Sequence, residues 1–188
     1  MNGMRAVDAL RPATVAAAVI LTAAACTKAP ATPPPAPPSP SSAAPSTDPA
    51  AAVATTEILD RYRSFRQAYD AAGLTADYKS KDVTRYLVDP AKQEVVRFLL
   101  NTHIHGAVYK GEAQSTLTLA KLDLKAKTAT VSECYDATNY RLVFTKTSSP
   151  VPVPSGPRRA IIETQAKDFG GNKGWLFTKS ETFRDRSC

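Results

Sequence analysis

The chain lacks a hydrophobic run long enough to cross a bilayer. Its longest apolar stretch, residues 13–25, has thirteen residues and is interrupted by two threonines. A spanning helix needs about 20 apolar residues, whereas the apolar part of an export signal has about 7 to 15. Because Arg5 and Arg11 precede the stretch, the pattern predicts a cleavable leader over residues 1–25 rather than a membrane span.

Cysteine is scarce, with three in the chain, and the first of them follows three alanines directly. Cys26 at this place fits lipoprotein processing, in which cleavage before the cysteine frees an amine and the thiol carries a diacylglyceryl group. Such signals usually have Leu three positions before the cysteine, where this chain has Ala23. We expect a palmitate-labelled Cys26 that anchors the chain to the extracytoplasmic face of the cell membrane. The alternative is an ordinary secretory signal cut near the same alanines.

The other two cysteines, Cys134 and Cys188, are expected to form a disulfide. Export leads to an oxidising compartment in which disulfides persist, and an even pair in the same domain is suited to a bridge. In the chain-entropy model, a bridge over a loop of this length stabilises the fold by about 4 kcal/mol. It would also fix the end of the chain, which stops on Cys188.

The chain after the leader begins with a segment of low complexity. Residues 27–55 contain nine prolines among Ala, Ser and Thr. Proline removes amide donors and fixes an extended backbone, and the other residues offer too little apolar surface to offset the entropy of ordering. We therefore expect a lipidated cysteine and disordered linker over residues 26–55. A single folded domain follows over residues 56–188, which is an ordinary domain size.

Long blocks of one charge are also missing. The predicted domain has 21 basic and 15 acidic residues, a net charge of +6, and no like-charge run longer than Arg158-Arg159. An exported chain without an aromatic-basic motif is not expected to bind nucleic acid. The charge indicates either a solvated basic surface or contact with anionic headgroups and wall polymers.

Catalytic and metal-binding patterns are few. The chain has no Gly-x-Ser-x-Gly, phosphate-loop or dinucleotide fingerprint, and its two histidines are His103 and His105. Residues two apart on a helix point in different directions, so this pair cannot hold one metal ion. We expect no metal and no cofactor. Asp60 and Glu133 are interpreted as surface acids of a helix and a strand.

Helical spacing dominates the first half of the predicted domain. Apolar residues recur every three to four positions over Thr56–Ala72, and Gly73 is expected to end that helix. A short helix is predicted over Asp82–Leu87. A third helix is predicted to begin at Asp89-Pro90, a cap followed by proline, and to end near Gly106.

The second half follows a period of two, which is typical of strands. Leu117 and Leu119 lie on one parity and Leu122 and Leu124 on the other, so a β-bulge is expected near Ala120-Lys121. Further strands are predicted over 128–136, 140–146, 158–169 and 175–183, the last two joined by a glycine-rich hairpin at 170–174. Helices followed by an antiparallel sheet predict an α+β fold, with N-terminal helices packed on a strongly curved sheet.

The pattern resembles the nuclear transport factor 2-like (SnoaL-like) superfamily. Within that superfamily it resembles a group of small secreted actinobacterial lipoproteins of uncharacterised activity. The resemblance rests on Ile58–Arg63 with Tyr69 and Gly73, on Ala129–Asp136, on the Gly170–Trp175 hairpin and on Cys188. It implies a cone in which a bent sheet encloses a pocket against the helices. The additional short strand that the family has near its second helix has no clear counterpart in this sequence.

Some members of that superfamily are isomerases, dehydratases or polyketide cyclases with an Asp or His base in the pocket. Here Asp136 and His103 are the candidates, although Asp136 also fits a turn cap with Thr138, and His103 fits an ordinary buried or rim histidine. Aromatic residues either line the pocket or form a plain core. The candidate pocket residues are Tyr62, Tyr69, Tyr86, His103, Asp136, Tyr140 and Trp175.

The sequence therefore favours a non-catalytic binding or scaffold module over an enzyme. Its expected partners are the membrane, through the lipid anchor, and an envelope protein or small apolar ligand. A pocket enzyme of the isomerase or cyclase kind that uses Asp136 or His103 is the alternative, and a sheet-mediated homodimer is a further one.

Overall fold

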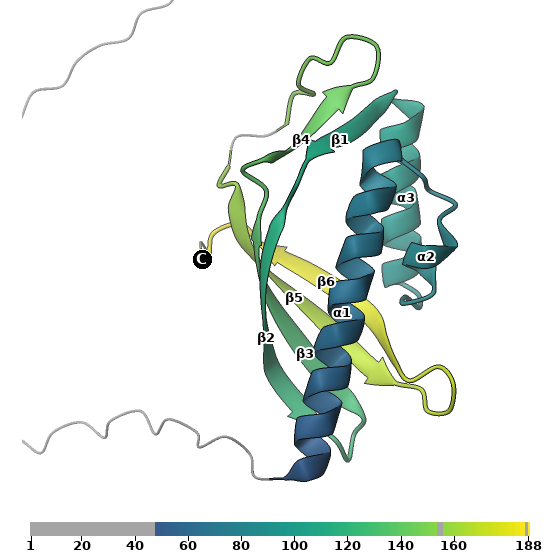
Figure 1. The fold of residues 1–188 in the computed structure, drawn as a ribbon, viewed down its shortest axis with the longest axis vertical. Coiled ribbons are helices and arrows are strands. Elements are labelled where there is room, and N and C mark those ends of the chain that lie inside the picture. The colour runs from purple at the N-terminus through teal and green to yellow at the C-terminus, as the bar shows by residue number, and fades with distance from the viewer. Residues whose placement is uncertain (1–47, 154–155, 187) are drawn as a thin grey trace, which may run out of the picture. The chain divides into compact units, whose positions relative to one another are not determined.

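The computed structural model describes residues 48–153, 156–186 and 188. The predicted leader, Cys26 and most of the predicted linker lie outside these residues. The elements are α1 (Pro49–Thr75), α2 (Lys81–Thr84), α3 (Ala91–Ile104), β1 (Ala107–Gly111), β2 (Gln114–Asp123), β3 (Thr128–Asp136), β4 (Tyr140–Phe144), β5 (Arg159–Asp168) and β6 (Trp175–Phe183). Figure 1 shows the three helices gathered on one side of the strands. The predicted α+β order is confirmed.

Helix α1 begins earlier than predicted. The side chain of Asp48 accepts a hydrogen bond from the backbone N–H of Ala50 at 2.9 Å, and Pro49 occupies the first turn. This cap-and-proline signal is followed by alanines, which have the highest helix propensity. The boundary at residue 55 was therefore wrong, because residues 49–55 form the first two turns of α1 and bury Ala54.

Helix α1 also continues past Gly73, to Thr75, and its left-handed cap is Ala76 with φ 52°. Gly73 therefore does not end the helix as predicted, and its lack of a side chain has a different role. A Cβ atom at this position would lie well inside van der Waals contact with the Tyr140 hydroxyl and close to the Tyr109 ring. The missing side chain lets β1 and β4 approach the helix.

Helices α2 and α3 differ from the prediction at their ends. Helix α2 is a single turn, capped by the Ser80 hydroxyl, which accepts from the Val83 N–H at 3.4 Å. Helix α3 begins after Pro90 without a side-chain cap, and Asp89 instead accepts from the Gln93 side chain at 3.0 Å. Leu99 is the most deeply buried residue of α3. Helix α2 ends at Thr84, three residues before the predicted end at Leu87, whereas α3 ends at Ile104, close to the predicted end near Gly106.

The main sheet is antiparallel in the order β2-β3-β5-β6. Its register shifts between Leu119 and Lys121, which confirms the predicted bulge in β2, and shifts again in β5 between Gln165 and Ala166. The bounds predicted for β3 and β6 are confirmed, and β5 differs by one residue at each end. The hairpin at residues 170–174 joins β5 to β6 as expected.

Two pairings were not predicted. Strand β1 pairs with β4 in a separate two-stranded ribbon, with Tyr109 opposite Leu142. The segment after α2 forms an isolated parallel bridge from Leu87 to Phe177, where Val88 N–H donates to the Phe177 carbonyl at 3.1 Å. This bridge follows α2 directly and attaches its end to β6.

Candidate functional site

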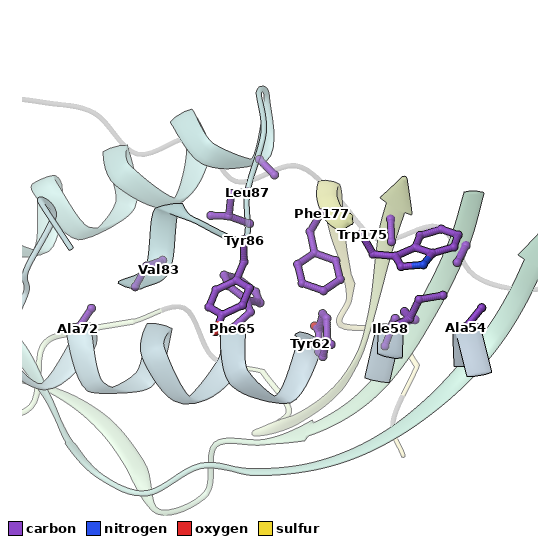
Figure 2. Packing of buried hydrophobic residues seen from close by; sticks show 14 of the residues in the cluster. Ala54, Ile58, Tyr62, Phe65, Ala72, Val83, Tyr86, Leu87, Trp175 and Phe177 are labelled. Atoms are coloured by element: carbon purple, nitrogen blue, oxygen red, sulfur yellow. The ribbon is translucent and has the colours of Figure 1, made fainter. Parts of the chain in front are cut away.

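The space between α1 and the main sheet is filled by aromatic side chains. Figure 2 shows Tyr62 and Phe65 of α1 meeting Phe177 of β6. The ring centroids of Tyr62 and Phe177 are 5.1 Å apart with an edge-to-face geometry, and those of Phe65 and Phe177 are 5.5 Å apart. Such contacts stabilise a core beyond simple area burial. The side chains that were expected either to line a pocket or to form core form core here.

Within this core lies a charged side chain, Glu133 of β3, which has no exposed surface. The interpretation of Glu133 as a surface acid was wrong. Its neighbours at alternate positions, Val131 and Tyr135, share the face of β3 that packs on α1. The Tyr62 hydroxyl donates to Glu133 Oε2 at 2.7 Å, and the Ser115 hydroxyl donates to Glu133 Oε1. A buried carboxylate needs such donors because burial without them is costly.

The counter-charge of Glu133 is Arg66 of α1. Arg66 Nε lies 3.2 Å from Glu133 Oε1, and Arg66 Nη2 lies 3.4 Å from Asp70 Oδ1. The guanidinium is also 4.4 Å from the ring centroid of Tyr135 and 5.1 Å from that of Tyr69. Burial lowers the pKa of Arg66, but the carboxylates of Glu133 and Asp70 outweigh it and leave that pKa raised. Arg66 therefore stays charged inside the protein.

Five phenols surround this ion pair, and we call them the tyrosine cluster: Tyr62, Tyr69, Tyr109, Tyr135 and Tyr140. Tyr109 and Tyr140 stack face to face at 4.4 Å, and the Tyr140 hydroxyl donates to the Asp70 carbonyl at 3.0 Å. Burial raises the pKa of all five phenols above the ordinary value. It likewise raises the pKa of Asp70, against the opposing effect of Arg66.

The remaining aromatic candidates lie apart from the ion pair. Tyr86 is buried beside Phe65, and its hydroxyl accepts from Arg85 at 2.9 Å. Trp175 is 5% exposed at the start of β6, where its carbonyl accepts from Arg61 Nε at 2.8 Å. Of the aromatic candidates, Tyr62, Tyr86, Tyr140 and Trp175 are therefore buried, and Tyr69 is partly buried against the core.

His103 and Asp136 do not join the core. His103 is exposed in the last turn of α3, with its ring centroid 5.3 Å from that of Tyr78, so its interpretation as a buried histidine was wrong. Thr102 is the buried residue of that turn. Asp136 Oδ1 accepts from the Thr138 N–H at 2.9 Å, and its other oxygen lies 3.6 Å from Arg159. The hydrogen bonds from Thr138, aided by Arg159, lower the pKa of Asp136, which fits the turn-capping alternative.

The open depressions lie on the outside of the fold. A shallow groove of about 500 Å³ lies along α1 beside α2, and its lining includes Ala68, Ala71 and Thr75 together with Asp82 and Arg85. A smaller depression of about 80 Å³ lies on the outer face of the sheet between Thr130, Gln165 and Lys179. Both are lined mainly by polar groups.

The two cysteines of the domain meet at the end of the chain. The sulfur atoms of Cys134 and Cys188 are 2.12 Å apart and the Cα atoms 5.7 Å apart, which is compatible with a disulfide. No group of three or more His, Cys, Asp or Glu in the described part of the chain is placed to hold a metal ion. Within the same residues, no helix is both long enough and apolar enough to span a membrane.

Comparisons with known proteins address the fold alone. No family model matches the chain, and no curated protein matches it. Among solved structures, the crystal structure of the intermembrane space region of chloroplast protein ARC6 is similar, with a TM-score of 0.50 and 10% sequence identity. The similarity covers 69% of this chain and 96% of that one. The chain thus belongs, by its structure, to the α+β domains with helices packed on antiparallel sheet.

Proposed function

We propose that the chain is an exported lipoprotein, anchored through Cys26 to the extracytoplasmic face of the cell membrane, whose domain binds a partner and performs no catalysis. The single observation that carries the binding proposal is the filled interior. Tyr62, Phe65 and Phe177 occupy the space between α1 and the sheet. A pocket enzyme of the isomerase or cyclase kind would need open space there for its substrate and base, so we propose that partners meet the outer surfaces.

The proposed export is supported by the cysteines. A pair of sulfur atoms at 2.12 Å, Cys134 and Cys188, suits an oxidising compartment and is unusual for a cytosolic chain. The remaining cysteine, Cys26, follows three alanines directly at the end of the predicted leader. A nuclear transport factor 2-like cone is our proposal for the finer fold. Its support is the bulge at Leu119–Lys121, the second shift at Gln165–Ala166 and the long helix on one sheet face.

The anchor is tested by metabolic labelling with palmitate in an actinobacterial host. We expect label in the wild-type chain and none in Cys26→Ala, with the latter released from the membrane fraction. The exposed Lys146→Ala variant serves as a control for expression, because it leaves the export signal intact. A wild-type chain without label would contradict the anchor.

The binding role is tested by crosslinking the anchored chain in its native envelope. The same specific envelope component should be recovered with the wild type and with the double variant His103→Gln/Asp136→Asn, since neither side chain belongs to the core. If a component is crosslinked to the wild type but not to the double variant, and the variant also loses a turnover activity, the pocket-enzyme alternative is favoured. Recovery of background alone would contradict the binding proposal.

A further inference from the structure

One end of the domain exposes apolar side chains at the tips of its turns. Leu124 lies in the β2–β3 turn with 38% of its surface exposed, and Phe169 lies in the β5–β6 turn with 44% exposed. Val53, on the first turns of α1, is 69% exposed. Figure 1 shows the start of α1 and both turns at the same end of the domain, opposite the β1–β4 ribbon. We call this end, residues 121–127 and 167–173 with Val53, the entry surface, because the chain enters the domain there.

The turns of the entry surface are fixed to one another and to α1. The Asp168 N–H donates to the Lys127 carbonyl at 3.0 Å, which joins the end of β5 to the start of β3. Arg61 Nη2 donates to the Lys173 carbonyl at 2.8 Å, which ties the β5–β6 turn to the helix. The turns that carry Leu124 and Phe169 are therefore fixed by hydrogen bonds to neighbouring elements, so the two exposed side chains do not lie on isolated loops.

The same surface is rich in lysine. Its two turns carry five exposed lysines against two aspartates, which leaves +3: Lys121, Lys125, Lys127, Lys167 and Lys173 against Asp123 and Asp168. Each aspartate accepts a backbone hydrogen bond within its own turn, from Ala126 and Gly170 respectively, both at 2.8 Å. Asp48, Glu57 and Arg61 at the start of α1 change the total by one unit, to +2. The surface thus combines positive charge with protruding apolar groups.

We propose that the entry surface docks on a bilayer that contains anionic lipid. Lysines attract the negative headgroups, while Leu124 and Phe169 reach the boundary between headgroups and acyl chains, a combination typical of interfacial membrane binding. A soluble or wall-bound polyanion would use the lysines and gain nothing from the apolar tips. The presence of both features on one surface selects the bilayer.

This inference rests on the proposed anchor for its biological setting, although the surface itself does not depend on Cys26. Twenty-two residues separate Cys26 from Pro49, so the tether is no longer than about 80 Å. A domain confined by such a tether has an effective concentration near the membrane in the millimolar range. A weak surface affinity is then sufficient to turn the domain toward the bilayer.

The test uses the chain without residues 1–25 and with Cys26→Ser, so that no lipid contributes. Sedimentation with vesicles of 30% phosphatidylglycerol in phosphatidylcholine is compared with vesicles of phosphatidylcholine alone, at low salt. We expect roughly hundredfold stronger partition onto the anionic vesicles, from a net charge of +3 on the two turns and about a factor of five for each charge. Lys125→Gln/Lys127→Gln should weaken it roughly 25-fold, since each lysine near an anionic surface is worth about a factor of five. Circular dichroism verifies that each variant is folded.

Two matched controls separate this surface from general charge and hydrophobicity. Lys110→Gln/Lys146→Gln removes the same charge at the β1–β4 ribbon, and Ile104→Ser removes an apolar side chain that is 67% exposed at the end of α3. Both should leave partition within twofold of the parent chain. Leu124→Ser/Phe169→Ser should reduce it several-fold, including at salt concentrations that screen the lysines.

Three results would overturn the inference. The first is absence of vesicle binding by the unlipidated chain. This result would not affect the proposed anchor, which the palmitate labelling tests separately. The second is an equal loss in the ribbon control, which indicates general charge attraction. The third is binding that heparin abolishes and Leu124→Ser/Phe169→Ser does not change, which indicates a polyanion as partner. Conversely, loss of palmitate label with vesicle binding intact would contradict the anchor alone.

Discussion

The buried ion pair gives the sharpest prediction, a large coupling energy between Arg66 and Glu133. The perturbations are Arg66→Met, Glu133→Gln and the double variant. Glutamine keeps the shape of Glu133 and an acceptor for the Tyr62 hydroxyl, which donates at 2.7 Å, while methionine keeps much of the apolar stem of Arg66. Each single change therefore removes charge with little loss of volume.

The magnitude follows from the geometry. At 3.2 Å and an effective dielectric constant of about 20, the gross attraction is about 5 kcal/mol. Asp70, 3.4 Å away with 27% of its side chain exposed, remains beside Arg66 and offsets part of the loss in Glu133→Gln. We expect each single variant to lose about 3 kcal/mol, since removal of one partner leaves the other buried and unpaired. The double variant should lose about 3 to 4 kcal/mol in total, a coupling of about 2 kcal/mol or more.

The free energy of unfolding is measured in urea from far-ultraviolet circular dichroism and from the fluorescence of Trp175, the one tryptophan of the chain. Asp60→Asn is the matched control, because its partner Arg63 is 56% exposed and surface pairs contribute less than about 1 kcal/mol. Single-variant losses that add within about 0.5 kcal/mol would refute the reasoning. So would a Glu133→Gln chain as stable as the wild type.

Three further predictions follow from the same contacts. Cys134→Ser/Cys188→Ser should lose up to about 4 kcal/mol of unfolding free energy, measured in urea, and reductant should reproduce that loss in the wild type but change nothing in the variant. Gly73→Ala should lose about 1 to 3 kcal/mol by overpacking against Tyr140, and Tyr140→Phe should recover part of it; a stabilised Gly73→Ala would contradict the contact. The pKa values of the tyrosine cluster are raised in the folded protein, so the phenols ionise more easily once the chain unfolds. The free energy of unfolding should therefore fall as the pH rises above the unfolded pKa of about 10. In an alkaline titration, a rise in tyrosinate absorbance before the circular dichroism of the fold is lost would contradict this.

The local part of the fold was predictable because local signals specify it. Alternation defined β3 and β6, the change of parity after Leu119 located the bulge, and the glycines at 170–174 defined the hairpin. The start of α1 was predictable in the same way. Asp48-Pro49 is the cap-and-proline signal that was applied to Asp89-Pro90, but the proline-rich composition around it outweighed the signal.

The candidate site was harder to predict because its members are distant in sequence. Glu133 shares the inward parity of Ala129 and Val131, so alternation alone would have placed it inside. Its charge favoured the surface, and the donor that makes burial tolerable, Tyr62, is 71 residues away. Strand β1 has the same difficulty, since five residues become a strand only through pairing with β4.

Adjacent residues of β3 secure both faces of the sheet. Glu133 points toward α1 and binds Arg66 and Tyr62, while Cys134 points to the outer face and lies within bonding distance of Cys188. The tail is held there as well, because Arg186 Nη2 donates to Glu163 Oε1 at 3.2 Å. Since local opening requires the loss of such ties, the centre of the sheet should be its most protected part in hydrogen exchange. A domain whose middle is closed on both faces meets partners at its ends. At the end where the chain enters, exposed lysines and apolar side chains share two turns that hydrogen bonds tie to each other and to α1.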